Sequence, residues 1–257
     1  MYVDLLQQNG RYTLTREEAE HECSMSPAAV KQAARRLVLQ RRLAMPRRGF
    51  FVIVPLEYRS AGSPPPSWFI DALMEFHGLP YYVALLSAAA LHGAAHQQPQ
   101  EFQVITTTAL RPAAVGNTRL RFLSKKRAPE MPTVVLKTET GSIRVATVEA
   151  TVLDLVRYPQ ASGGLGNVAT VYSELAEKID PDRLAKLAET EDDLAIVQRA
   201  GFLLDHVGAS NKTEVLARMV VDRRPRLAPL RAGLGGVGFA KDSRWRVLVN
   251  ERVEVDE

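Results

Sequence analysis

The chain has 257 residues, 46% of them hydrophobic, and a formal net charge of +4 at neutral pH. This composition predicts a globular protein and argues against an intrinsically disordered chain. The single cysteine excludes an intramolecular disulfide and any zinc site built from several cysteines. No apolar run reaches the roughly 18 residues that a membrane span needs, and no signal peptide is recognisable, so we expect a cytoplasmic protein.

The excess positive charge lies at the beginning of the chain. Residues 1–54 contain nine Lys or Arg and five Asp or Glu, whereas residues 55–257 contain 24 of each kind. Residues 27–54 contain seven basic residues and no acidic one. A localised basic region indicates a polyanionic partner better than a high isoelectric point does. A solvated basic face is the alternative interpretation.

Three short helices are predicted before residue 40. The first covers about residues 2–8 and ends at a turn. Thr15 and Glu18 have the spacing of a capping box, which predicts the start of a second helix. Ser26 and Pro27 are typical of the N-cap and the first position of a third helix.

A β-hairpin is predicted next, with strands over residues 43–45 and 50–54. The four-residue turn between them, 46–49, ends in a glycine. Three helices followed by a hairpin are the order of a winged helix-turn-helix, which we assign to residues 1–58. Some winged helices bind proteins instead of DNA, and that alternative stays open.

The third helix and the hairpin are the expected DNA-binding elements. Lys31, Gln32 and Arg35 lie near the start of the third helix, where side chains usually reach base edges. Arg47 and Arg48 form the tip of the wing and are expected to contact the phosphate backbone. The complete set of candidate DNA-binding residues is Ser26, Lys31, Gln32, Arg35, Arg36, Arg41, Arg42, Arg47 and Arg48.

A proline-rich segment, residues 59–66, is predicted to be a linker. Residues 67–257 are predicted to form a larger mixed α/β domain, so the fold class is α/β (α+β). Its expected helices are 68–77, 80–91 and one that begins after Thr147. Its expected strands are 102–108, 119–123, 133–137, 142–146 and 244–255.

A second basic cluster is found in this otherwise neutral domain. It could extend a DNA footprint or bind an acidic protein, and a solvated loop is an equal alternative. The residues of this possible secondary basic patch are Arg119, Arg121, Lys125, Lys126 and Arg127.

No pattern predicts catalysis, a metal or a cofactor. The G-x-G-x-x-G match at residues 233–238 is followed by an apparent strand where a dinucleotide site needs a helix, and it is interpreted as a flexible loop. His92 and His96 are four residues apart with Gly93 between them, and they are interpreted as a helix end. The chain contains no Asp/Glu-x-Lys triplet, which argues against a restriction-type nuclease. We therefore expect no catalytic, cofactor-binding or metal-binding residues.

The sequence resembles the antitoxins of abortive-infection type E systems, also called type IV toxin–antitoxin systems. The similarity begins with PRRGFFVIVP at residues 46–55 and continues through ALHGAAHQQP at 90–99 and FQVITT at 102–107. Its most specific segment is IRVATVEATVLDLVRYPQASGGL at residues 143–165.

The resemblance implies a protein without enzymatic activity and with two functions. The N-terminal domain would repress its own operon by binding inverted repeats in double-stranded DNA. The C-terminal domain would counter a toxin that resembles a nucleotidyltransferase, and a direct complex with that toxin is left open. The alternative is a stand-alone transcriptional regulator whose second domain dimerises or binds a ligand.

Overall fold

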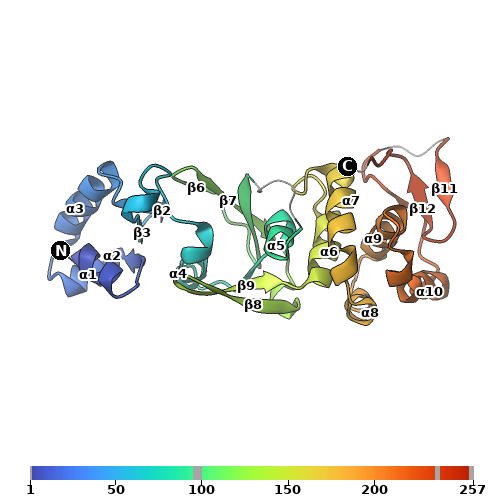
Figure 1. Ribbon diagram of the computed structural model, residues 1–257, viewed down its shortest axis with the longest axis horizontal. Coiled ribbons are helices and arrows are strands. Elements are labelled where there is room, and N and C mark those ends of the chain that lie inside the picture. The colour runs from blue at the N-terminus through green and yellow to red at the C-terminus, as the bar shows by residue number, and fades with distance from the viewer. Residues whose placement is uncertain (1, 95–99, 235–237, 255–257) are drawn as a thin grey trace. The chain divides into compact units, whose positions relative to one another are not determined.

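The computed structural model describes residues 2–94, 100–234 and 238–254 (Figure 1). It is a mixed α+β structure that divides into two compact units. The first unit contains Met1–Val83 and Gln100–Val145, and the second contains Ala84–Pro99 and Ala146–Glu257. The predicted linker, residues 59–66, lies inside the first unit. The functional domain boundaries stay a prediction.

The first unit begins with three helices and a three-stranded sheet. The helices are α1 (Tyr2–Gln8), α2 (Arg16–Glu22) and α3 (Pro27–Leu39). The strands are β1 (Thr13–Thr15), β2 (Leu43–Arg47) and β3 (Phe50–Ile53), in the order β1-β3-β2 with antiparallel pairing. The predicted caps are confirmed, because Thr15 Oγ1 accepts the amide of Glu18 at 3.1 Å and Ser26 Oγ that of Ala29 at 3.3 Å.

Apolar side chains from all these elements form one core. Helical spacing on α3 brings Val30 and Ala34 onto the buried face, where they meet Phe51 and Ile53 of β3. The core also contains Val3, Leu6, Leu14, Ala19 and Leu43. The burial of this face of α3 determines which of its side chains remain exposed.

A six-stranded mixed sheet forms the rest of the first unit, with the strand order β6-β7-β5-β4-β9-β8. Its strands are β4 (Tyr81–Val83), β5 (Glu101–Thr106), β6 (Ala113–Val115), β7 (Thr118–Ser124), β8 (Thr133–Thr138) and β9 (Gly141–Ala146). β5 runs parallel to β7 and antiparallel to β4, with Val104 opposite both Phe122 and Val83. The helix α4 (Ile70–Phe76) and three 3-10 turns, Leu56–Tyr58, Pro66–Trp68 and Ala128–Glu130, complete the unit.

The predicted linker is attached to this sheet. The amide of Asn117 donates to the backbone oxygen of Ala61 at 2.8 Å. Gly62 and Gly116 both have positive φ, and an added Cβ on Gly116 would lie 2.3 Å from the oxygen of Ala61. The chain at residues 61–62 therefore passes directly over the turn between β6 and β7.

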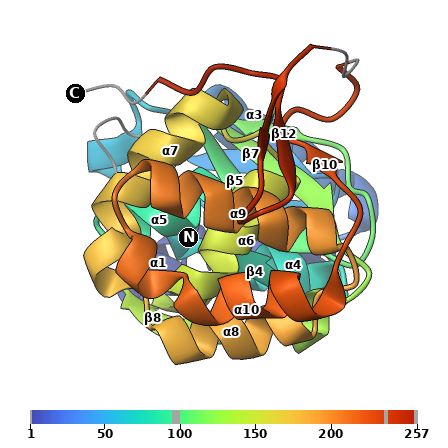
Figure 2. The ribbon, with the colours of Figure 1, turned by 90° about the vertical axis from the view of Figure 1, so that its right-hand side faces the viewer.

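The second unit is mainly helical. Its helices are α5 (Leu85–Leu91), α6 (Val148–Arg157), α7 (Gly164–Leu175), α8 (Pro181–Glu189), α9 (Leu194–His206) and α10 (Glu214–Arg223), with 3-10 turns at Ala176–Lys178 and Ser210–Lys212. Figure 2 shows α9 and α10 in orange, with α6 behind α9. The helix α9 contacts α6, α7 and α10.

A small three-stranded sheet ends the second unit. It contains β10 (Ala228–Pro229), β11 (Ala240–Asp242) and β12 (Val247–Val249), in the order β10-β12-β11. Both β10 and β12 pack against α9. The predicted strand over 244–255 is therefore wrong in its length, since of the described residues 244–254 only Val247–Val249 form a paired strand.

One predicted helix is wrong in a way that matters for the fold. The sequence predicts a single apolar helix over residues 80–91. Tyr81–Val83 instead form β4, an inner strand of the six-stranded sheet, and only Leu85–Leu91 are helical. A strand buried on both faces and a buried helix have equally continuous apolar sequences, which explains the error.

Candidate nucleic-acid interface

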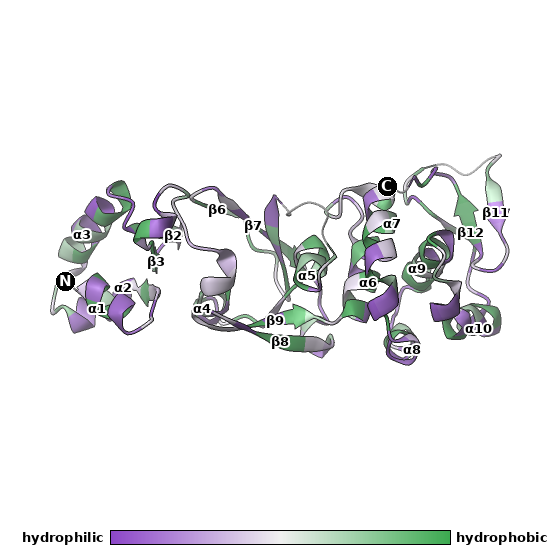
Figure 3. Cartoon of the chain, in the orientation of Figure 1, coloured by the Kyte–Doolittle hydropathy of each residue, from purple (hydrophilic) through white to green (hydrophobic). Residues whose placement is uncertain are grey.

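The exposed face of α3 carries four of the predicted DNA-binding side chains. Because Val30 and Ala34 are buried, the positions that follow them project to solvent. Lys31, Gln32, Arg35 and Arg36 are all exposed. Figure 3 shows α3 with alternating hydrophilic and hydrophobic segments, as expected for an amphipathic helix.

Within residues 2–94, 100–234 and 238–254, none of these four side chains has a hydrogen-bond or ion-pair partner in the protein. Lys31 and Arg35 are one helical turn apart, as are Gln32 and Arg36. Their donors are therefore all available to an external acceptor. Guanidinium and ammonium groups pair with phosphate oxygens and with guanine, and the amide of glutamine pairs with adenine.

A groove with a volume of about 770 Å³ separates α3 from the β2–β3 hairpin. Lys31 and Arg35 of α3 and Arg48 of the hairpin contribute positive charge to its lining. Arg16 of α2 also lines it, but its charge is paired with Glu17 and Glu20. The remaining lining residues are small or apolar: Pro27, Ala28, Ala34, Val38, Leu39, Met45, Gly49 and Phe51. The groove therefore has a largely apolar lining with exposed cations from α3 and from the hairpin.

This groove combines two chemistries that a nucleic acid can use. The cations at its border can hold phosphate oxygens. The exposed apolar side chains Leu39 and Met45, which are 76% and 50% exposed, could contact sugars or thymine methyl groups. Arg16 is not among the predicted residues. Its exposure to the groove depends on the fold of α2, and sequence spacing alone does not reveal it.

Arg47 and Arg48 lie in different environments despite being neighbours in the β2–β3 hairpin. Arg48 is exposed and lines the groove. Arg47 is half-buried, with its guanidinium 5.4 Å from the centre of the Phe122 ring. It donates to the backbone oxygen of Pro112 at 3.4 Å and to that of Arg111. Burial lowers the pKa of Arg47, so its charge is partly desolvated.

Arg41 and Arg42 also differ. Arg42 is half-buried and forms an ion pair with Asp4 of α1, so part of its charge is neutralised within the protein. Arg41 is exposed and follows α3 with φ of +52°. The serine predicted to hold a phosphate, Ser26, is exposed but uses its Oγ to cap α3.

The tyrosine at the start of the chain connects α1 to α2. Tyr2 donates to Glu18 at 2.9 Å, and Arg11 pairs with the same carboxylate at 2.7 Å. Burial raises the pKa of Tyr2 to about 12, with help from the bond to Glu18. Burial alone would raise the pKa of Glu18, but the bonds from Arg11 and Tyr2 lower it. This network fixes α1 against α2.

Three of the five cations of the secondary basic patch have partners within the protein. Arg121 pairs with Glu101 on the neighbouring strand at 3.2 Å, and Arg127 pairs with Glu130 at 2.7 Å. Lys125 also has a partner within the protein. Arg119 and Lys126 are exposed, and the described part of the chain offers no partner for either side chain. The patch thus presents about two cations to solvent.

No cluster of three or more His, Cys, Asp or Glu side chains with metal-binding geometry occurs among the described residues. His92 Nε2 donates to the backbone oxygen of Ala146, 2.7 Å away, within the second unit. His96 and residues 235–237 of the glycine-rich match lie outside the described residues. None of the helices in the described chain has the length and apolar character that a membrane crossing requires.

Comparison with known proteins gives one match to a family model and one similar solved structure. Residues 82–206 match the family model of the AbiEi antitoxin C-terminal domain. The crystal structure of the RV2827C protein from Mycobacterium tuberculosis is similar, with a TM-score of 0.68 and 16% sequence identity, and the alignment covers 96% of this chain and 89% of that chain. At this identity the likeness shows a shared fold. The search of curated proteins gives no match.

Proposed function

We propose, from the match of residues 82–206 to the AbiEi antitoxin C-terminal domain, that the chain is an antitoxin that also represses its own operon. Repression uses residues 1–58 as a winged helix-turn-helix that binds inverted repeats in the promoter. Neutralisation uses the larger C-terminal part against a toxin of the nucleotidyltransferase type. The family match supports the antitoxin role. The exposed cations of α3 support the DNA-binding role.

Several features of the N-terminal elements support DNA binding. The order of three helices and a hairpin fits a winged helix, with α3 as the recognition helix and β2–β3 as the wing. Lys31, Gln32 and Arg35 lie on the exposed face of α3. Arg48 reaches the same groove from the wing. A recognition helix and a wing that share one positively charged groove can hold the backbone while reading bases.

The second candidate function is a stand-alone regulator without a toxin. Its second domain would dimerise or bind a ligand, and it would not protect cells from the product of a neighbouring gene. A separate alternative is a winged helix that binds a protein instead of DNA. The apolar residues Val38, Leu39 and Met45 in the groove favour it, because apolar exposed patches are typical of protein interfaces.

The DNA-binding role is tested by fluorescence anisotropy with labelled duplex from the chain's own promoter. Substituting Lys31→Ala and Arg35→Ala should weaken binding at least ten-fold, since each charge-assisted contact is worth about 1–3 kcal/mol. The matched control is Lys186→Ala with Arg218→Ala, which removes the same charge from exposed positions of the second unit, outside both basic regions. Equal weakening by both pairs, or no promoter binding by the natural chain, contradicts the proposal.

The antitoxin role is tested by growth of bacteria that co-express the full chain with the neighbouring gene product. The full chain is used because a fragment starting near residue 67 would lose the segment that packs over Gly116. Rescue by both the natural chain and the Lys31→Ala, Arg35→Ala variant assigns neutralisation to surfaces other than α3. The antitoxin role is contradicted if the neighbouring gene product is toxic alone and the natural chain, with both proteins expressed, does not restore growth. The stand-alone regulator is then the remaining candidate.

A further inference from the structure

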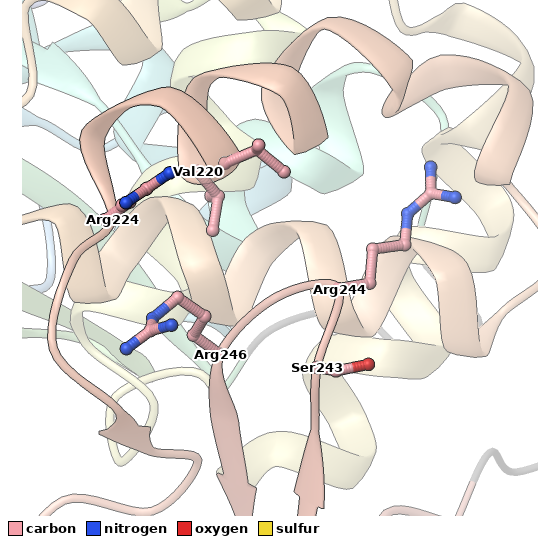
Figure 4. A pocket seen from close by; sticks show the side chains of 6 residues that line it. Val220, Arg224, Ser243, Arg244 and Arg246 are labelled. Carbon is pink, nitrogen blue, oxygen red and sulfur yellow. The ribbon is translucent and has the colours of Figure 1, made fainter.

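A pocket of about 340 Å³ lies in the second unit, beyond the residues that match the antitoxin family. It is formed by the end of α10 and by the turn that joins β11 to β12. Figure 4 shows its lining side chains from close by. The complete lining is Val220, Val221, Arg224, Ser243, Arg244 and Arg246. Three of these six residues are arginines and none is acidic.

The surrounding sequence is also basic. Residues 223–246 contain seven Lys or Arg and a single acidic residue, Asp242. Asp242 is engaged locally, because one of its carboxylate oxygens accepts the amide of Trp245 at 2.7 Å. Positive charge therefore dominates around the pocket, although the whole chain beyond residue 54 has no net charge.

The three arginines of the pocket do not have the same role. Arg244 pairs with Asp205 at 3.1 Å and with Glu214 at 3.0 Å, and its hydrogen bond to Glu214 raises its pKa. In Figure 4 its side chain extends away from Arg224 and Arg246. Arg244 is thus a structural cation whose charge is already balanced.

Arg224 and Arg246 are the available cations. Arg246 donates its Nε to the backbone oxygen of Pro225 at 2.6 Å, which fixes the direction of its guanidinium. In the described part of the chain, no protein group is hydrogen-bonded to the terminal nitrogens of Arg246. The same holds for the guanidinium of Arg224 and for the hydroxyl of Ser243. Two guanidinium groups and a hydroxyl therefore border one pocket with unused donors.

The backbone at both arginines is unusual. Arg224 and Arg246 have φ values of +43° and +53°, in the left-handed region that favours glycine. A residue other than glycine costs about 1–2 kcal/mol in this conformation. Both positions nevertheless carry long cationic side chains that border the same pocket. Local strain of this kind is frequent where side chains serve a ligand.

We propose that this pocket binds a phosphate group, with Arg224 and Arg246 as its two guanidinium ligands and Ser243 as a hydroxyl donor. Planar guanidinium groups bind phosphate oxygens in pairs, and phosphate accepts more hydrogen bonds than a carboxylate does. Val220 and Val221 supply an apolar wall against which a sugar or base can pack. The phosphate comes either from a free nucleotide or from a nucleic-acid backbone.

Isothermal titration calorimetry with the full-length chain tests the proposal and separates the two sources. The probes are inorganic pyrophosphate, ATP and a duplex oligonucleotide, the last with a chain that also carries Lys31→Ala and Arg35→Ala to reduce binding by α3. The test variant is Arg224→Gly with Arg246→Gly, because glycine adopts both backbone conformations without strain and the fold should be kept. The control, Arg218→Ala with Arg226→Ala, removes the same charge from exposed positions that do not line the pocket.

We expect at least one probe to bind the natural pocket and to lose about ten-fold or more in affinity in the glycine variant, with little change in the control. If the glycine variant loses affinity for pyrophosphate or ATP, the natural ligand is a free phosphate compound. If it loses affinity for the duplex alone, the ligand is a nucleic-acid backbone. The proposal is overturned if no probe binds, or if the control variant loses as much affinity as the glycine variant. A far-UV circular dichroism spectrum confirms that each variant is folded.

Discussion

The guanidinium of Arg47 lies 5.4 Å from the centre of the Phe122 ring, which connects the β2–β3 hairpin to strand β7 of the six-stranded sheet. The next residue, Arg48, is exposed toward the groove beside α3. We therefore assign different tasks to these two adjacent arginines of the hairpin. Arg47 holds the hairpin on the sheet, and Arg48 is the hairpin cation that we propose to contact DNA.

We expect single substitutions to separate these two tasks. Arg48→Ala should weaken binding to every DNA sequence and reduce the slope of log affinity against log salt by about 0.9, the value for one phosphate contact. Arg47→Ala should leave that slope unchanged and lower the free energy of unfolding by about 1 kcal/mol, because it removes a partly desolvated cation–π contact. Anisotropy at several salt concentrations and urea unfolding measure the two effects. A reduced slope for Arg47→Ala would refute its assignment to the sheet.

The stability of the first unit should decrease as the pH falls below about 6.5. Burial, and then the charge of Arg47, lower the pKa of His77 below its ordinary value of 6.5. A group with a lowered pKa in the folded state binds its proton more tightly when unfolded. Its contribution to stability is therefore present above pH 6.5 and is lost as the pH falls toward the folded pKa.

Urea unfolding of the natural chain and of His77→Gln at pH 8.0 and pH 5.5 tests this dependence. The natural chain should lose more stability between the two values than the variant, which has no imidazole to protonate. The variant Arg47→Ala should show an intermediate loss, because one of the two causes of the lowered pKa is gone. Parallel pH dependences for all three chains would show that His77 is not responsible.

The N-terminal helices could be predicted because their signals are local. Thr15 and Ser26 cap helices within three residues of themselves, and the apolar spacing that buries Val30 and Ala34 belongs to α3 alone. The same spacing predicts that Lys31 is exposed, as it is. Local patterns therefore located most of the candidate DNA-binding side chains.

Features that depend on distant partners could not be predicted. Arg47 has the same sequence context as Arg48, and only its contact with Phe122 on another sheet distinguishes them. Strand β1 is three residues long and is defined by its pairing with β3. The pocket at Arg224 and Arg246 requires the packing of the β11–β12 turn beside α10, which neither segment indicates separately.

The close contact between Gly116 and the chain at residues 61–62 gives a prediction about the proposed linker. Gly116→Ala would place a Cβ 2.3 Å from the oxygen of Ala61 and 2.6 Å from the carbonyl carbon of Gly62, and both are backbone atoms that cannot rotate away. We expect a loss of about 2–4 kcal/mol in unfolding free energy and faster proteolysis at residues 59–66.

Gly10→Ala is the matched control for this substitution. Gly10 has φ of +72°, and a Cβ added there would have no atom within 4 Å apart from its own chain neighbours. It therefore carries the cost of a positive φ, about 1–2 kcal/mol, without the steric conflict. Similar losses for the two variants, or unchanged proteolysis for Gly116→Ala, would show that residues 61–62 are not held against this turn.

The packing of Trp245 on Gly201 attaches the C-terminal strands to α9. An added Cβ on Gly201 would lie 2.1 Å from the indole ring, and Trp245 is 1% exposed with its Nε1 donating to Asp205 at 2.7 Å. Replacing a helical glycine by alanine normally stabilises by about 1 kcal/mol. Here we expect Gly201→Ala to destabilise by about 1–3 kcal/mol, because the indole ring is enclosed and must shift.

A double-mutant cycle with Trp245→Leu identifies the cause. In the smaller leucine background Gly201→Ala should cost much less, or stabilise, which gives a coupling energy of about 1–3 kcal/mol. If the two losses simply add, the indole ring is not the obstacle. Because the β11–β12 turn contains Ser243, Trp245 and Arg246, a shift of Trp245 should also weaken phosphate binding in the adjacent pocket. Titration of Gly201→Ala with pyrophosphate measures that consequence directly.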